Sequence, residues 1–317
     1  MKSKITTSAW SWIPTLYFAQ GLPYVVVMTL AVIMFKRLGI TNTDIALYTS
    51  WLYLPWVIKP LWSPLVDIVK TKRWWVITMQ LVIGGGLAGI ALTLPGPHAF
   101  RYSLAFMWLL AFSSATHDIA TDGFYMLGLD TKKQAFFVGI RNTAYRLAML
   151  TGQGLIVMLA GWLEKIYSST LPEEIAVPKA WSITFYLLAT IFVLLFFYHQ
   201  FILPKPENDI PVKNGNPLHA FFQTFITFFQ KKGIIAALVF ILLFRFAESQ
   251  LVKIASPFLL DNPEVGGLGL NTMQVGTIYG VVGLIALTIG GILGGIFMAK
   301  NGLKHWIWWM TAAMNLP

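Results

Sequence analysis

Eight long apolar runs decide the environment in which this chain folds. They cover about residues 10–35, 46–68, 74–94, 102–128, 135–163, 181–203, 233–260 and 273–299. Because a helix of about 20 apolar residues crosses the hydrocarbon core of a bilayer, each run is long enough to span it. A ninth run starts near His305 and extends to Pro317, which is too short to cross. The runs predict an all-α integral membrane chain, truncated after about eight complete spans.

The composition agrees with lipid as the main solvent. Of the 317 residues, 11% are charged and 56% are apolar, whereas a soluble domain carries roughly 25% charged residues. Prolines inside the runs, such as Pro14, Pro55 and Pro60, are tolerated in membrane bundles and predict broken or closely packed helices. The chain has no cysteine, which excludes disulfides and thiolate metal sites.

Lysine and arginine gather in alternate connections between the runs. Of 23 such residues, 13 lie on the side of the N-terminus, five lie on the other side and five fall within the runs. Basic residues accumulate on the cytoplasmic side of membrane proteins. We therefore expect a cytoplasmic N-terminus, and the net charge of +10 is a topology signal rather than a nucleic-acid surface.

The runs divide into two sets joined by a charged connection. Residues 1–203 predict an N-terminal six-helix bundle, 204–232 a cytoplasmic linker with an interfacial helix, and 233–317 a partial C-terminal bundle. Phenylalanines at helical spacing between 221 and 229 favour the interfacial helix, and an early start of the seventh span is the alternative. Three segments of the second set resemble segments of the first at a nearly constant offset. Parallel repeats of this kind place a binding site between the halves.

Two aspartates fall within the fourth run, where an ionised group costs at least about 2.5 kcal/mol. Asp118 and Asp122 are four residues apart and so share a helix face. Arg141 and Arg146 in the fifth run lie at matching depths, but five residues turn a helix by about 140°, so the two arginines face different partners. We expect Arg141 to be a structural ion-pair partner. Two interpretations stay open: ion pairs that only join helices, or a titrating aspartate that couples protons beside an arginine that binds an anion.

Polar residues in the other runs complete a candidate cavity. Polar side chains form a stripe at helical spacing along the first run, and another along the seventh run, which is the repeat partner of the first. In the fifth run, polar residues share one helix face with Arg146. The substrate-cavity candidates are Tyr17, Gln20, Tyr24, Lys59, Asn142, Arg146, Gln153, Arg245 and Lys253. The proton-coupling candidates are Asp118, Asp122 and Glu248. A hydrogen-bonded seam between helices is the alternative interpretation of the stripe in the first run.

Three motifs resemble one known family. Residues 18–23 read FAQGLP, residues 59–67 read KPLWSPLVD and residues 118–123 read DIATDG. Together they resemble the AmpG-type muropeptide permeases and the related acetyl-CoA transporters of the major facilitator superfamily. The resemblance implies 6+6 parallel repeats, the bacterial inner membrane and proton-driven import of anhydro-muropeptides. It also implies a gating loop at Asp67, Lys72 and Arg73, in which Lys70 replaces the usual glycine.

Other functions remain to be weighed against muropeptide import. The buried cations suit a carrier of acetyl-CoA or another large organic anion equally well. A non-transporting membrane receptor or scaffold would use the same charges as ion pairs. A membrane enzyme is disfavoured because the sequence offers no nucleophile or metal set, and the five histidines lack zinc-type spacing. We expect a small-molecule or sugar-peptide substrate, protons and the lipid bilayer as partners, and no cofactor, metal or nucleic acid. The oligomeric state is open.

Overall fold

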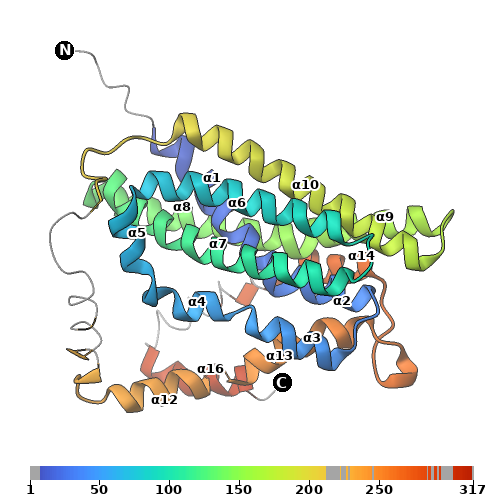
Figure 1. Cartoon of the computed structure of the whole chain (residues 1–317). Helices are drawn as coiled ribbons and strands as arrows, with labels where there is room; N and C mark the ends of the chain where they lie inside the picture. The colour runs from blue at the N-terminus through green and yellow to red at the C-terminus, as the bar shows by residue number, and fades with distance from the viewer. Residues whose placement is uncertain are drawn as a thin grey trace.

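The computed structural model describes residues 8–211 without interruption and, after them, 222, 226–227, 229–244, 246–283, 285–286, 289–290, 293 and 303–315. Every regular element in these residues is a helix, which confirms the all-α prediction (Figure 1). The phenylalanine-rich helix expected between 221 and 229 falls mostly outside the described residues.

The helices of the first half cover the predicted spans, with differences in the second and the sixth. They are α1 (Ala9–Val25), η1 (Val26–Leu30), α2 (Ala31–Arg37), α3 (Asn42–Trp51), α4 (Leu54–Ile58), η2 (Lys59–Leu61), α5 (Ser63–Val69), α6 (Lys72–Thr93), α7 (Ala99–Gly128), α8 (Thr131–Leu150), η3 (Thr151–Ile156), α9 (Val157–Ser168) and α10 (Glu173–Ile202). The described helices of the second half are α12 (Ile234–Phe244), α13 (Phe246–Leu260), η4 (Pro263–Val265), α14 (Thr272–Thr277), η5 (Ile278–Val282) and α16 (Leu303–Asn315).

Length and apolar composition qualify five described stretches as membrane spans. They are Ala9–Arg37, Lys72–Thr93, Phe136–Ser168, Glu173–Ile202 and Ile234–Leu260. The helix of the sixth predicted span starts before the apolar run, because α10 begins at Glu173 rather than near residue 181. Two glutamates in its first turn favour an early start, since carboxylates stabilise the N-terminus of a helix.

The second predicted span is not one helix but four short pieces. α3 ends at Trp51, and α4 runs only to Ile58 before the single 3-10 turn η2. A proline stands in the first turn of each of α4, η2 and α5, where it lacks the N–H that an unbroken helix would need. The breaks predicted from proline are confirmed here, and one of them places Lys59 on an irregular turn in the middle of the span.

Close packing organises the first half around α6, which lies between α7 and α10, while α1 packs on α8 and α7. Fully buried rings such as Trp12, Phe124 and Phe185 fill the spaces between these helices. Because lipid is as apolar as these side chains, close van der Waals fit is what favours helix association. At Gly89, for example, an added Cβ would lie 2.3 Å from Cε1 of Phe106.

Glycines also bring the two halves of the chain together. α14 and η5 of the second half pack against α9 and η3 of the first. A Cβ added at Gly161 would lie 2.4 Å from the backbone nitrogen of Met273, and one added at Gly154 would lie 2.6 Å from the Cα of Gly280. Small residues are needed where helix backbones approach this closely. Figure 1 shows α12 and α16 lying apart from the group of α6, α7 and α10.

Polar side chains join the halves at the end of the bundle away from the N-terminus. Asp261 accepts a hydrogen bond from Nδ2 of Asn42 at 2.8 Å and forms an ion pair with Lys36. The buried Glu164 accepts a hydrogen bond from Oγ1 of Thr272 at 2.7 Å. We name these five residues the distal latch, since each contact connects the first half to the second.

The carboxylate of Asp261 keeps the distal latch charged at neutral pH. Partial burial raises the pKa of this carboxyl, but hydrogen bonds from Lys36 and Asn42 and the positive charge of Lys36 outweigh burial and hold the pKa below its usual range. A depressed pKa contributes stability that is present above the unfolded pKa of about 3.9 and is lost as the pH falls through the folded pKa. Asp261 therefore does not titrate near neutral pH.

Candidate functional site

Asp118 lies in the middle of α7 and contacts two other helical elements. Its carboxylate forms an ion pair with Nζ of Lys59 on η2 and accepts a hydrogen bond from Nε2 of Gln20 on α1. The Asp118 side chain is 16% exposed, and that of Lys59 is 36% exposed. The break in the second predicted span thus supplies the cation that compensates the carboxylate of Asp118.

Asp122 lies one turn further along α7 and has a second set of partners. The hydroxyl of Tyr17 donates to its Oδ1 at 3.0 Å, and Nη1 of Arg141 lies 3.6 Å from the same oxygen. Arg141 also donates to the Tyr17 hydroxyl at 3.1 Å. Its guanidinium carbon lies 5.4 Å from the ring centre of Tyr17 and 5.0 Å from that of Tyr125. Both rings therefore add cation–π attraction to the ion pair.

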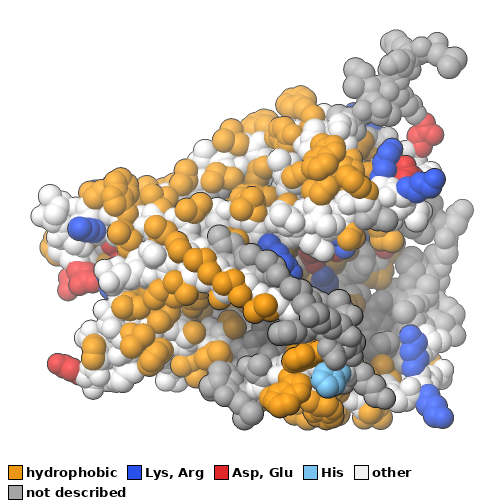
Figure 2. Space-filling model, turned by 180° about the vertical axis from the view of Figure 1, so that it is seen from behind, with side chains coloured by type: hydrophobic (Ala, Val, Ile, Leu, Met, Phe, Trp, Pro, Cys, Tyr) orange, Lys and Arg blue, Asp and Glu red, His pale blue; other side chains and the backbone are white. Residues whose placement is uncertain are grey.

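These contacts bring four segments together in one polar cluster. We name it the carboxylate cluster, and it consists of Tyr17, Gln20, Lys59, Asp118, Asp122 and Arg141. Its two carboxylates and two cations sum to zero charge. Among the described residues, Oε1 of Gln20 and Nε of Arg141 are buried and have no hydrogen-bond partner. Figure 2 shows Lys or Arg side chains set back from the surface near the middle of this view.

The structure places two of the predicted site residues, Arg141 and Asp122, next to each other. Nη1 of Arg141 lies 3.6 Å from Oδ1 of Asp122, and a purely structural role for this arginine stays a prediction. Asp122, a proton-coupling candidate within the fourth run, has a side chain that is 51% exposed, so the protein alone does not enclose it. The reason is its position on α7, which leaves one side of the carboxylate open while Tyr17 and Arg141 cover the other.

The other cavity candidates of the first half lie outside the carboxylate cluster. Asn142 and Arg146 are exposed on α8, and Arg146 forms no ion pair with another described residue. Nε2 of Gln153 donates to Oγ1 of Thr29 at 3.2 Å. The ring of Tyr24 packs edge to face against Trp56, with centres 5.2 Å apart. Their role in a substrate cavity stays a prediction.

The candidates of the second half are described only in part. Nζ of Lys253 donates to the carbonyl oxygen of Thr49 at 3.1 Å and approaches its Oγ1 at 3.3 Å, so this lysine joins α13 to α3. Arg245 lies outside the described residues, and the side chain of Glu248 does as well. Their proposed roles rest on the sequence alone.

The loop between α5 and α6 is held by side chains at both of its ends. Asp67 forms an ion pair with Lys72. The aliphatic part of the Lys72 side chain lies against Gly123, which directly follows Asp122. Asp209 accepts backbone N–H bonds from Lys72 at 2.6 Å and from Arg73 at 2.9 Å. The gating-loop candidates therefore lie next to the carboxylate cluster, while Arg73 bonds to the end of α10 through the carbonyl oxygens of Gln200 and Leu203.

A buried chain of hydrogen bonds crosses the first half without entering the carboxylate cluster. His117 lies 3.1 Å from Nε2 of Gln80, whose Oε1 lies 3.0 Å from Nδ1 of His199. The Nε2 atom of His199 is 3.0 Å from Oγ1 of Thr15. His117 follows Thr116 and precedes Asp118, but it points into the helix bundle. Among the described residues, no group of three or more acidic, histidine or cysteine side chains is arranged to hold a metal ion.

Sequence reasoning missed three residues that the structure places in polar contacts. Glu164 lies just past the predicted end of the fifth span, so it was not counted among the buried acids. Asp261 stands in a connection, where nothing in the local pattern indicates its partner Lys36. Tyr125 follows the aspartates by three residues, and this i, i+3 spacing from Asp122 was the available signal.

Comparisons with known proteins show the family to which this fold and polar site belong. The Major Facilitator Superfamily model matches residues 15–316, so the chain belongs to that superfamily. The superfamily groups membrane transporters rather than enzymes, as the sequence predicts. The chain is thus a multi-pass membrane protein of the class that the motifs indicated.

Within the superfamily, the chain is similar to curated proteins with AmpG-type names. The chain is 28% identical over 302 residues to a putative transporter AmpG 4 of Rickettsia felis, a match that covers 89% of this chain and 66% of the relative. It is 26% identical over 299 residues to an anhydromuropeptide permease of Escherichia coli K12, which covers 90% of this chain and 54% of that protein. The chain therefore spans only about half to two thirds of the length of these curated relatives.

A solved structure shares the fold. It is the crystal structure of a bacterial homologue of the human lysosomal transporter Spinster, in an inward-facing and unoccupied conformation. The two superpose with a TM-score of 0.65 at 17% identity, and the match covers 94% of this chain and 64% of the other. At this identity the likeness concerns the fold alone, which agrees with the predicted major facilitator architecture.

Proposed function

We propose that this protein is a proton-coupled secondary transporter of the bacterial inner membrane that imports anhydro-muropeptides. The relatives named AmpG and anhydromuropeptide permease support the substrate. The excess of lysine and arginine near the N-terminal side supports a cytoplasmic N-terminus. The observation that carries proton coupling is the carboxylate cluster, in which Asp118 and Asp122 are held at membrane depth by Lys59 and Arg141.

The charge balance of the carboxylate cluster suits joint binding of a proton and an anion. While both aspartates are ionised, their charges cancel those of the two cations. A proton on Asp118 leaves Lys59 without its partner, and Lys59 is then available to an anionic group of the substrate. A muropeptide carries such groups, because its peptide part ends in a carboxylate. The site thus takes up one proton and one anion without leaving net charge in the membrane.

The distal latch supports an inward-facing state of the transporter. With the N-terminus in the cytoplasm, the latch lies at the opposite, periplasmic end of the bundle. Asp261, Glu164 and the glycines of α9 and α14 hold the two halves together there. A closed periplasmic end leaves access to the cytoplasmic end, as in the inward-facing structure that shares this fold.

Uptake measurements test the proposed function. We expect inside-alkaline vesicles that contain the full-length protein to accumulate labelled anhydro-muropeptide, and to lose accumulation when an ionophore collapses the proton gradient. The same vesicles should not accumulate labelled acetyl-CoA. Uptake of acetyl-CoA in place of muropeptide would move the protein to the carriers of large organic anions. Uptake of neither compound, in vesicles where the protein is folded, would favour the receptor or scaffold.

A further inference from the structure

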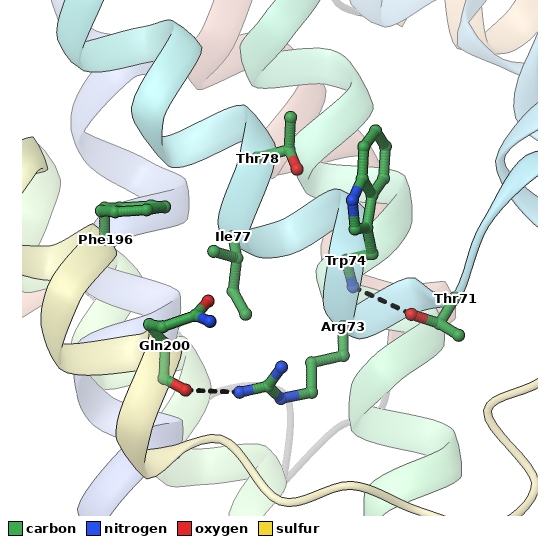
Figure 3. A pocket seen from close by; sticks show the side chains of 7 residues that line it. All are labelled: Thr71, Arg73, Trp74, Ile77, Thr78, Phe196 and Gln200. Atoms are coloured by element: carbon green, nitrogen blue, oxygen red, sulfur yellow. Dashed lines mark hydrogen bonds between the residues drawn. The ribbon is translucent and has the colours of Figure 1, made fainter.

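A cavity separate from the carboxylate cluster opens between the start of α6 and the end of α10. Its volume is about 350 Å³, and Thr71, Arg73, Thr78 and Gln200 supply its polar lining (Figure 3). Ile77 and Phe196 form an apolar wall. Both helix ends belong to the N-terminal side of the bundle, which the proposed orientation places at the cytoplasmic surface.

The cavity faces outward, toward the region where lipid headgroups lie. Trp74 borders it and is 41% exposed, and Phe197 and Phe201 on the last turns of α10 are also exposed. Tryptophan near the end of a span is typical of the membrane interface. The cavity therefore lies on the outer surface of the bundle at headgroup depth.

Arg73 gives this cavity a positive charge, and the nearby carboxylate of Asp209 attracts that charge without forming an ion pair with the guanidinium. Its Nε and Nη2 atoms donate to the carbonyl oxygens of Leu203 and Gln200, which carry no net charge. Among the described residues, Arg73 forms no ion pair, whereas the neighbouring Lys72 is paired with Asp67. Figure 3 shows the other terminal nitrogen of Arg73 directed into the cavity, away from Gln200.

The nearby acidic residue does not occupy the free guanidinium nitrogen. Both oxygens of Asp209 accept backbone N–H bonds, at 2.6 Å from Lys72 and at 2.9 Å from Arg73. Thr71 adds a donor, because its Oγ1 already accepts the N–H of Trp74 at 3.1 Å and its hydroxyl proton is left to donate. The cavity thus presents a guanidinium and a hydroxyl beside an apolar wall.

We propose that this cavity binds the phosphate headgroup of an anionic glycerophospholipid from the cytoplasmic leaflet. Arginine forms strong charge-assisted hydrogen bonds to phosphate, and basic pockets between transmembrane helices on the cytoplasmic side recognise anionic headgroups. The wall of Ile77 and Phe196 suits the first carbons of an acyl chain. The bound lipid ties α6 to α10. This proposal rests on the orientation of the protein and not on its substrate.

Lipid retention measured by native mass spectrometry tests the site. The full-length protein is purified in a neutral detergent, stripped of lipid and mixed with phosphatidylglycerol, phosphatidylcholine or inorganic phosphate. We expect wild type to retain one phosphatidylglycerol at a level at least about fivefold above phosphatidylcholine, which corresponds to about 1 kcal/mol. Inorganic phosphate should neither bind nor displace the lipid.

Variants distinguish lipid bound in the cavity from lipid bound elsewhere on the protein surface. Arg73→Gln and Thr78→Val should each reduce retention of phosphatidylglycerol severalfold, whereas Lys133→Gln, which removes an exposed cation at the same end, should not. Because Arg73 also bonds to the end of α10, a loss of stability would obscure the effect of its variant on lipid binding. Thr78→Val removes a hydroxyl from the polar lining of the cavity, replaces it with a methyl group of similar size, and then decides the question. Equal retention by wild type and both cavity variants would overturn the proposal. So would equal binding of phosphatidylcholine, or displacement of the lipid by inorganic phosphate.

Discussion

Replacing Lys59 with methionine should abolish proton-driven uptake and lower the free energy of unfolding by about 2 kcal/mol. The change leaves the carboxylate of Asp118, which is 16% exposed, without its cation. Removing one partner of a fully buried pair costs about 3–5 kcal/mol, and the 36% exposure of Lys59 reduces this value. Thermal unfolding in detergent measures the stability, and vesicle uptake measures the function.

A double variant separates the structural role of this pair from its role in transport. In Lys59→Met with Asp118→Leu no charge is left unpaired, so we expect stability to return to within about 1 kcal/mol of wild type, because apolar replacement of a buried ion pair is often neutral. Transport should stay absent. Lys133→Met is the matched control, because it breaks an exposed ion pair with Asp130 and should change stability by less than about 0.5 kcal/mol. A double variant that transports like wild type would show that the pair only joins helices.

Replacing Gly161 with leucine is expected to force the two halves apart at the distal latch. A Cβ added at Gly161 would lie 2.4 Å from the backbone nitrogen of Met273. A backbone cannot move aside as a flexible side chain can. Extra carbons in a packed interface cost about 1–3 kcal/mol, which is enough to shift a two-state equilibrium about fivefold or more. The variant should therefore populate the latch-closed state poorly and should transport slowly.

Cross-linking measures that shift directly, because the natural chain contains no cysteine. Cysteines introduced at Asn42 and Asp261 remove the contacts of Asp261, but the bond from Thr272 to Glu164 and the packing of α14 on α9 still join the halves. A short bifunctional reagent should join these cysteines efficiently when Gly161 is kept, and much less efficiently with Gly161→Leu. Gly139→Leu is the control within the same continuous helix, since nothing lies within 4 Å of its added Cβ. Equal cross-linking in both glycine variants would contradict the close contact of α9 with α14.

The spans and the shared face of Asp118 and Asp122 could be predicted from the sequence because they depend on local periodicity alone. The breaks in the second span followed from proline, whose missing N–H acts on its own helix. The pairing of Lys59 with Asp118 was left open, because it depends on how η2 turns toward α7. Glu164 and Asp261 were missed for a similar reason: their contacts across the two halves, with Thr272 and Lys36, join segments more than 100 residues apart.

The direct test of the central claim compares proton dependence in Asp118→Asn and Asp122→Asn. Asparagine keeps an oxygen that accepts the hydrogen bond of Gln20 or Tyr17, but it cannot take up a proton near neutral pH. Uptake of labelled anhydro-muropeptide is measured with and without an imposed pH gradient, beside exchange of the same compound at equal pH. We predict that at least one variant still exchanges but no longer accumulates substrate in response to the gradient. Unchanged proton dependence in both variants would contradict a coupling role for the carboxylate cluster.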